Sequence, residues 1–395
     1  MISQGPIPIA GALVLGTGLV ALSHLGGVLP IGHSMRHSVG ISPRLAAPSV
    51  ASPPGIRPGL YALSFASDRA GCAGGLHRIV CTTDAGRRWT PRYAGAETVV
   101  GLDLLTPRVG WAVGVHTLLK TVDGGLHWAQ AGVGEPTQPL RSVDFVTAAR
   151  GWGVAGGTPL SYAGTHQVSW PFAGGTLVQT LDGGRTWAIR PTAGPVDSIC
   201  FNGGAGWAAH EATVLRTQDG GRTWRRAMTF PITHSRGWFA SVRCTGAATA
   251  WVLLSGGVGA SNQQPYLLYR TSDGGRHWQA VLKEVYFAGS AYPSLPIVVS
   301  GPGSYIGPLS AVDRATAYVL GICFPCSLHN SIVMSRVQNG GQTVHYVGAV
   351  PGLTSEGPLA IAFVDASHGW VAGTTGHVTE ILATSNGGKT WQRQF

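Results

Sequence analysis

Apolar segments of strand length and glycine-rich polar turns follow one another in a repeating order along the chain after residue 55. The turn motif is seen in Thr-Val-Asp-Gly-Gly-Leu-His-Trp at residues 121–128. Asp-Gly-Gly between β-forming residues favours a hairpin, because glycine adopts positive φ and the aspartate accepts hydrogen bonds from turn N–H groups. The copies are marked by Asp84, Asp123, Asp182, Asp219, Asp273, Asn339 and Asn386, and six of the seven end in Trp89, Trp128, Trp187, Trp224, Trp278 or Trp391.

A second element, Gly-Trp or a related pair, precedes each turn. Seven residues before its second member stands an apolar residue, namely Phe65, Leu104, Phe145, Cys200, Cys244, Ala311 or Phe363. This constant spacing predicts a connecting loop of fixed length and four strands in each repeat. Four-stranded units that recur about every 40 to 60 residues predict an all-β fold, a seven-bladed β-propeller of four-stranded antiparallel blades with its turns on one face.

The turn, Ser/Thr-x-Asp/Asn-x-Gly-x-x-Trp, resembles the Asp-box, or BNR repeat, of sialidase-like propellers. In combination with the Gly-Trp strands, it is most similar to the photosystem II stability and assembly factor family and its bacterial relatives. The resemblance covers roughly residues 56 to 395. It implies a non-catalytic propeller that acts as an assembly scaffold on the outer side of a membrane. Fold is a weaker guide to function than to architecture.

Variation in length falls in the connections that open on the face opposite the Asp boxes. Insertions on one face of a repeat array commonly mark a binding face. The candidate binding residues there are Trp170, Arg236, Trp238, Tyr266, Tyr286, Tyr292 and Tyr305, a composition typical of protein interfaces and of sugar-stacking surfaces. Alternatively, these rings fold the long loops back onto the propeller.

The box turns carry basic residues at matching positions, Arg87, Arg185, Arg222, Arg276 and Lys389. They predict a positive rim on the box face, which is either a set of solvated turn positions or a docking site for an anionic partner. The formal net charge of the whole chain is +10. Charge alone is weak support for nucleic-acid binding, and we expect none.

Catalytic chemistry has little support in the sequence. The start motif of sialidases is absent, and a glycosidase needs two carboxylates that flank the scissile bond. Glu211, Glu284, Asp144 and Asp313 are the candidates left for that role. The histidines form no spacing typical of a metal site, so we expect neither metal nor cofactor.

Six cysteines in an exported chain favour disulfides. Cys72 and Cys81 lie on neighbouring predicted strands, which suits a cross-strand bridge. Cys200 and Cys244 hold equivalent positions in adjacent repeats, where an interblade bridge and two buried thiols are equal alternatives. Cys323 and Cys326 lie in a long loop, where we expect a disulfide that cross-links the loop.

The first 35 residues are almost wholly apolar from Ile7 to Ile31, long enough to cross a bilayer core of ~30 Å. We interpret residues 1–35 as a signal peptide or membrane anchor, 36–55 as a Pro-rich linker and 56–395 as the propeller. The predicted location is extracytoplasmic, either secreted or anchored. The predicted function is that of a monomeric, non-catalytic scaffold that binds a protein partner, and membrane proteins are among the candidate partners. The alternative is a glycoside hydrolase or carbohydrate-binding propeller that acts on a polysaccharide.

Overall fold

The computed structural model describes residues 59–132, 138–159, 172–232, 238–257, 264–284, 301–323, 331–354, 359–375 and 378–395. The chain divides into two compact units, Met1–Ser49 and Val50–Phe395, and every described residue belongs to the second. Within these residues we find strands and a single short 3-10 helix. None of the described helical segments is long and apolar enough to cross a membrane.

The first five repeats each form one four-stranded antiparallel sheet. The first is β1 (Leu60–Phe65), β2 (Gly71–Gly75), β3 (Arg78–Thr82) and β4 (Thr90–Ala94), and the second is β5 (Val99–Leu104), β6 (Gly110–Gly114), β7 (Leu118–Thr121) and β8 (Ala129–Gln130). The third is β9 (Leu140–Phe145), β10 (Gly151–Ala155), β13 (Thr176–Thr180) and β14 (Ala188–Ile189), with a small hairpin of β11 (Thr158–Pro159) and β12 (Phe172–Ala173) between its middle strands. The fourth is β15 (Ser198–Asn202), β16 (Ala205–His210), β17 (Thr213–Thr217) and β18 (Arg225–Thr229), and the fifth is β19 (Phe239–Cys244), β20 (Ala250–Ser255), β21 (Tyr266–Thr271) and β22 (Gln279–Glu284).

The sixth and seventh repeats share one eight-stranded sheet. The sixth contains β23 (Tyr305–Ala311), β24 (Ala317–Cys323), β25 (Ser331–Gln338), the 3-10 turn η3 (Asn339–Gly341) and β26 (Thr343–Thr354). The seventh contains β27 (Ala360–Phe363), β28 (Gly369–Thr375), β29 (Val378–Thr384) and β30 (Gln392–Arg393). A single pair, Thr354 opposite Thr374, joins the two halves. The predicted all-β propeller of four-stranded antiparallel units is confirmed, and backbone pairing groups its seven repeats into six sheets.

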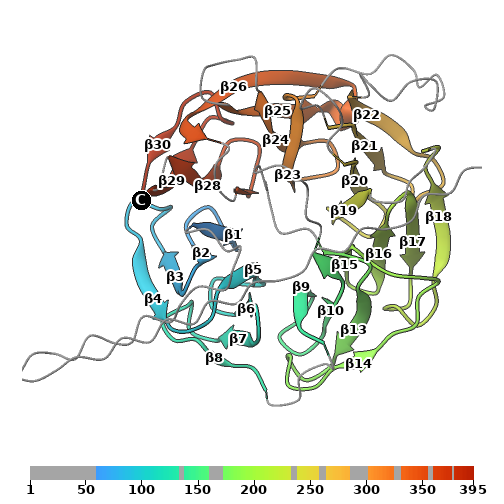
Figure 1. Cartoon of the computed structure of the whole chain (residues 1–395), viewed down its shortest axis with the longest axis horizontal. Coiled ribbons are helices and arrows are strands. Elements are labelled where there is room, and N and C mark those ends of the chain that lie inside the picture. The colour runs from blue at the N-terminus through green and yellow to red at the C-terminus, as the bar shows by residue number, and fades with distance from the viewer. Residues whose placement is uncertain are drawn as a thin grey trace, which may run out of the picture. The chain divides into compact units, whose positions relative to one another are not determined.

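The innermost strands follow one another in a closed ring (Figure 1). Each contacts the next, in the order β1, β5, β9, β15, β19, β23 and β27, and β27 contacts β1 again. Among the described strands, β1 pairs within the first repeat and β30 pairs within the last, so none of them is exchanged between these two repeats. Side chains close the ring: Phe65 stacks on Trp370 at 3.6 Å between ring centroids, and the Trp370 Nε1 donates to the Ala85 carbonyl.

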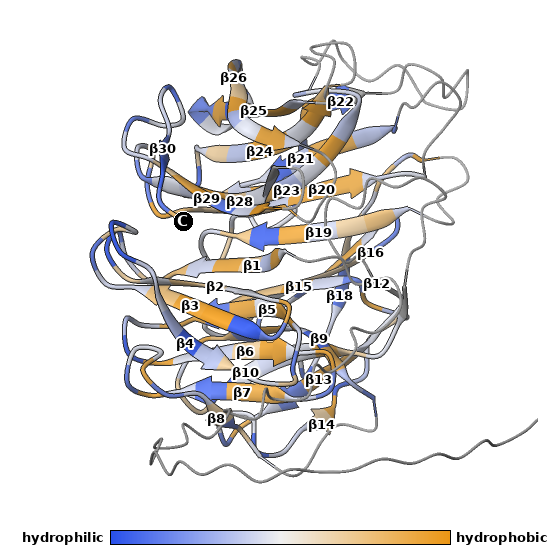
Figure 2. Ribbon diagram, turned by 60° about the vertical axis from the view of Figure 1, so that its left-hand side comes forward, coloured by the Kyte–Doolittle hydropathy of each residue, from blue (hydrophilic) through white to orange (hydrophobic). Residues whose placement is uncertain are grey.

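The tryptophans of the Gly-Trp pairs pack between neighbouring sheets. Trp111, Trp152, Trp207, Trp251 and Trp370 are almost fully buried. The indole of Trp152, for example, stacks on Phe201 of the next repeat and donates to the Gly220 carbonyl in that repeat's box turn. Hydrophobic stretches, orange in Figure 2, recur along the strands of the ring, for example on β3 and β20.

The box turns have the predicted hairpin chemistry. In the second repeat, the Thr121 hydroxyl accepts the Gly125 N–H at 2.9 Å and donates to Asp123, whose carboxylate accepts the His127 N–H. The degraded copy at Asn339 still turns, with positive φ at Asn339, Gly340 and Gly341. The Gly124 N–H donates to the Arg108 carbonyl in the loop between the first two strands, which confirms that these two loops share one face.

One spacing prediction is wrong. In the fourth repeat the residue that pairs with the Gly-Trp glycine is Phe201, opposite Gly206, and not Cys200. The loop there is one residue shorter than in the first repeat, where Phe65 pairs with Gly71. Cys200 instead lies opposite Trp207. A tight Asn-Gly-Gly-Ala turn makes this shorter connection, with Gly203 at positive φ.

Candidate functional site

The residues predicted to bind a partner at the loop-rich face fall into two groups, those outside the described residues and those buried in the core. Trp170, Arg236, Tyr286 and Tyr292 lie outside the described residues. Trp238, Tyr266 and Tyr305 are buried, each in a different hydrophobic cluster. The expectation that these three rings are exposed is therefore wrong. Burial in the core releases more free energy than an exposed loop position would, and it gives the Tyr266 hydroxyl the Gly303 carbonyl as a partner at 3.0 Å.

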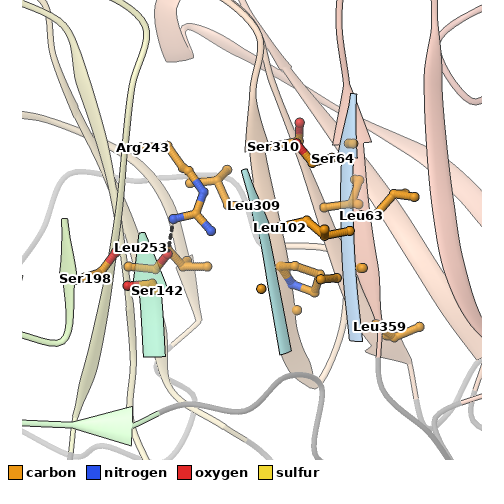
Figure 3. A pocket seen from close by; sticks show the side chains of 18 of the residues that line it. Leu63, Ser64, Leu102, Ser142, Ser198, Arg243, Leu253, Leu309, Ser310 and Leu359 are labelled. Carbon is orange, nitrogen blue, oxygen red and sulfur yellow. Dashed lines mark hydrogen bonds between the residues drawn. The ribbon is translucent and has the colours of Figure 1, made fainter. Parts of the chain in front are cut away.

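The main pocket in the described part of the chain lies in the centre of the ring and has a volume of about 590 Å³. All seven innermost strands contribute to its wall. Figure 3 shows Arg243 from β19 extending into this pocket beside Leu253 and Leu309, with Leu63, Leu102 and Leu359 on the other side of the view. Tyr305, one of the predicted binding residues, also lines it. The wall therefore combines leucine side chains with two arginines, Arg141 and Arg243.

A row of polar side chains near the ends of the innermost strands joins neighbouring repeats. The Asp103 carboxylate accepts the Phe145 N–H at 2.7 Å, and the Asp144 carboxylate accepts the Phe201 N–H in the same way. Equivalent bonds run from the Leu104 N–H to Ser64 and from the Phe363 N–H to Ser310. We refer to these as interblade bonds. They satisfy backbone donors at the ring's inner edge, where no further strand is available.

Burial in the pocket wall controls the ionisation of the two aspartates. Desolvation, with a smaller contribution from the negative charge of Asp144, raises the pKa of Asp103 to about 8. Desolvation raises the pKa of Asp144 to about 6, opposed by the Phe201 N–H and by the positive charge of Arg243. At neutral pH, Asp103 is therefore mainly protonated and Asp144 mainly ionised.

Arg243 is the more exposed of the two arginines that line the pocket. Its Nη1 donates to the Val242 carbonyl at 2.9 Å and to the Ser241 hydroxyl at 3.2 Å. Its side chain is exposed to the pocket, yet the surrounding protein lowers the pKa of the guanidinium by desolvation, against the effect of Asp144. The group stays charged at neutral pH, because an arginine pKa lies far above 7.

Asp197 directly precedes β15 and is buried, and both of its carboxylate oxygens accept hydrogen bonds. Its two oxygens accept the N–H groups of Gly174, Glu211 and Ala240, and His210 Nδ1 lies 2.7 Å from Oδ1. The hydrogen bond to Asp197 raises the pKa of His210. Three successive repeats therefore meet at one carboxylate, whose role is structural.

The carboxylates predicted as glycosidase candidates do not gather at one place. Asp144 lies in the pocket, whereas Asp313 accepts the Ala315 and Thr316 N–H groups in an exposed turn on the box face. Glu211 occupies a turn at positive φ next to Asp197, and nothing is described of the Glu284 side chain. The electrostatically coupled pair that the structure brings together is Asp103 with Asp144, and sequence reasoning missed Asp103. Among the described residues no group of three His, Cys, Asp or Glu side chains could hold a metal ion.

The box face carries both charge and apolar surface. The predicted basic residues Arg87, Arg185, Arg222, Arg276 and Lys389 are all exposed. Beside them, Val122, Leu126 and Leu181 are 62%, 48% and 61% exposed in the box turns of the second and third repeats. Other copies have Thr83, Gln218 or Ser272 where these two repeats have Val122 and Leu181. The composition of the box face therefore differs between repeats.

Two of the three predicted disulfides lie wholly within the described residues. Cys72 bonds to Cys81 within the first sheet, and Cys200 bonds to Cys244 between the fourth and fifth repeats. The second bond settles the alternative in favour of an interblade bridge. Cys200 occupies the same row as Ser64 and Asp103, and its sulfur also accepts the Cys244 N–H. Cys323 is disulfide-bonded as well, and Cys326 lies outside the described residues.

Comparison with known proteins agrees with this architecture. A sequence profile described as photosynthesis system II assembly factor YCF48 matches residues 172–319. No curated protein sequence matches the chain. A structure of YCF48 bound to a D1 peptide superimposes with a TM-score of 0.52 at 15% identity, covering 84% of this chain and 95% of that one. An ancestral GH74 enzyme gives 0.53 at 12% identity, covering 87% of this chain and 47% of that one, and U3-55K gives 0.50 at 8%, covering 83% and 88%.

The ring of four-stranded sheets and the repeated turns define a β-propeller of the Asp-box, or BNR, class. Structural likeness at such low identity establishes the fold alone. Within the class, the chain resembles the photosystem II assembly factor YCF48, whose profile spans parts of the third to sixth repeats.

Proposed function

We propose that this protein is a non-catalytic, extracytoplasmic propeller that binds a protein partner, as an assembly factor does, through the face opposite the Asp boxes. The observation that carries the proposal is the YCF48 profile match over residues 172–319. YCF48 itself has been seen with a bound D1 peptide. The matched segment includes the long connections into the fifth and sixth repeats, where Arg236, Tyr286 and Tyr292 lie, and the one within the fifth.

The extracytoplasmic location rests on two features. The disulfides Cys72–Cys81 and Cys200–Cys244 suit an oxidising compartment. The apolar segment from Ile7 to Ile31 suits export or anchoring. A monomer beside the membrane would then meet a membrane-associated partner, with its ring holding the loops in fixed geometry and so lowering the ordering cost of binding.

The test is affinity capture with the full chain from detergent-solubilised membranes of the source organism, followed by reciprocal capture with each retained protein. One variant carries Trp170→Ala, Tyr286→Ala and Tyr292→Ala. A matched variant on the box face carries Val122→Thr, Leu126→Gln and Leu181→Ser. Both are first shown to unfold at the same urea concentration as the native chain.

Retention of one defined protein that the loop variant loses and the box variant keeps would support the proposal. Retention lost only with the box variant would place the interface on the other face and overturn it. Capture of no protein by the native chain in either direction would contradict protein binding.

Asp103 and Asp144 favour a second candidate, hydrolysis or binding of a polysaccharide, because two coupled carboxylates with separated pKa values are typical of glycosidases. Their interblade bonds give both a structural explanation. Release of reducing ends from xyloglucan by the native chain, and its loss in Asp144→Asn, would overturn the non-catalytic proposal.

A further inference from the structure

The guanidinium of Arg243, in the central pocket, donates hydrogen bonds from only one of its three nitrogens to described residues. Both hydrogen bonds that Arg243 donates within the described residues start from Nη1. Nε and Nη2 have no hydrogen-bond partner among the described residues, and no carboxylate there lies within ion-pair distance of the guanidinium. A guanidinium edge formed by these two nitrogens matches the two oxygens of a carboxylate.

The charges around Arg243 favour a singly charged ligand. Asp144 is ionised at neutral pH and acts on Arg243 through space, while Asp103 is mainly protonated. Arg141 also lines the pocket, and burial lowers its pKa. Asp197 lies 2.7 Å from His210, and this hydrogen bond raises the pKa of the histidine. Tyr61 and Tyr305 also line the pocket, and burial raises the pKa of Tyr305. A dianion such as a phosphate monoester would be repelled by Asp144 more strongly than a monoanion.

The rest of the wall favours an apolar body. Leu253 and Leu309 flank Arg243 in Figure 3, but they are buried in one hydrophobic cluster. The half-buried Leu63 and Leu102, on the other side of the pocket, supply the accessible apolar wall. The volume of about 590 Å³ falls within the ~300–1,000 Å³ typical of small-molecule sites.

We propose that the central pocket binds a small monocarboxylate with an apolar body, held at its carboxylate by Arg243 and along its body by Leu63 and Leu102. This site goes beyond protein binding at the loop face and does not depend on it. The bound carboxylate would lie close enough to Asp144 to favour proton uptake there. Affinity should therefore increase as the pH falls from 7 toward 5.

The test is equilibrium dialysis of radiolabelled hexanoate against the full chain, with the same detergent on both sides. In Arg243→Met the apolar stem is kept and the charge is lost, so the dissociation constant should rise about 10- to 100-fold, as charge-assisted hydrogen bonds imply. Arg226→Met, on the exposed outer strand β18, is the matched control and should bind as the native chain does. Labelled 1-hexanol, which lacks the charge, should not distinguish Arg243→Met from the native chain.

Asp144→Asn gives an independent measurement in case Arg243→Met does not fold. It keeps an oxygen to accept the Phe201 N–H and removes the opposing charge. It should bind hexanoate more tightly than the native chain at pH 7 and lose the increase in affinity at pH 5. Undetectable binding of hexanoate to the native chain at millimolar concentration would overturn the proposal, as would equal affinity in Arg243→Met or an unchanged pH dependence in Asp144→Asn.

Discussion

Asp103 provides a direct test of the idea that one of the carboxyl groups that join neighbouring repeats is mainly uncharged at neutral pH. The Asp103 carboxyl accepts the Phe145 N–H of the next repeat, and burial raises its pKa to about 8. Asp103→Asn keeps an oxygen acceptor of the same shape and removes the ionisable proton. The substitution therefore separates the hydrogen bond from the charge.

The expected sign follows from proton binding in the two states. In the unfolded chain the carboxyl has a pKa near 3.9, so between pH 4 and 8 the folded chain holds a proton that the unfolded chain has lost. Stability contributed by this group is thus highest below pH 4, falls by about 1.4 kcal/mol per pH unit, and levels off above pH 8. From pH 5 to pH 7 the loss is about 2.7 kcal/mol, which the asparagine variant does not suffer.

Urea unfolding at pH 5, 6 and 7, followed by tryptophan fluorescence, measures this difference. The free energy of unfolding of Asp103→Asn minus that of the native chain should grow by about 2.7 kcal/mol over the range. Asp182→Asn is the control, because hydrogen bonds from Thr186 lower the pKa of Asp182 to about 2. Its stabilising effect is lost only as the pH falls through 2, so its difference from the native chain should stay constant between pH 5 and 7. A difference for Asp103→Asn that is constant or shrinks would refute the reasoning.

Two further predictions concern the joints between and within repeats. Cys200→Ser removes a cross-link with a sequence separation of 44 and should lower the free energy of unfolding in urea by about 4 kcal/mol. Cys72→Ser removes a cross-link with a separation of 9 and should lower it by about 2.5 kcal/mol. Equal losses would contradict the loop-entropy argument. Thr121→Val keeps the shape but leaves the buried Gly125 N–H without its acceptor, so it should cost about 1–3 kcal/mol; the exposed neighbour Val122→Thr should change stability by under about 0.5 kcal/mol, and a similar loss in both would argue against the hydrogen bond.

The fold could be predicted from the sequence because its main determinants are local. Asp123 and Gly125 specify one hairpin with no help from the rest of the chain, and the same turn chemistry recurs in each copy. The closed ring was not predictable in the same way. It depends on Phe65 meeting Trp370 across nearly the whole chain, and spacing within a repeat carries no information on such a contact.

The candidate site was predicted less well, for two physical reasons. Length variation located long loops, but it does not distinguish a ring that faces solvent from one that covers a core, and Trp238 and Tyr266 are of the second kind. The one-residue shortening before Gly206 moved Phe201 into the aromatic slot and Cys200 into the polar row. Asp103 was missed because its role depends on the Phe145 N–H of another repeat. The signal that could have found it was its place immediately before Leu104, matching Asp144 before Phe145.

The row of interblade bonds around the inner edge is not continuous through all seven repeats. In five of the seven repeats the residue in this row accepts a backbone N–H from the next repeat, and Cys200 adds a covalent bond at its junction. Arg243 holds the corresponding place in the fifth repeat and Ala362 holds it in the seventh, and neither side chain can accept a hydrogen bond. At the fifth-to-sixth junction the Gln264 side chain accepts the Ile306 N–H instead. Departures from a repeated pattern are expected at functional positions. Arg243 differs from Ala362 because it brings a charge to the pocket, which ligand binding would explain and the joining of repeats does not.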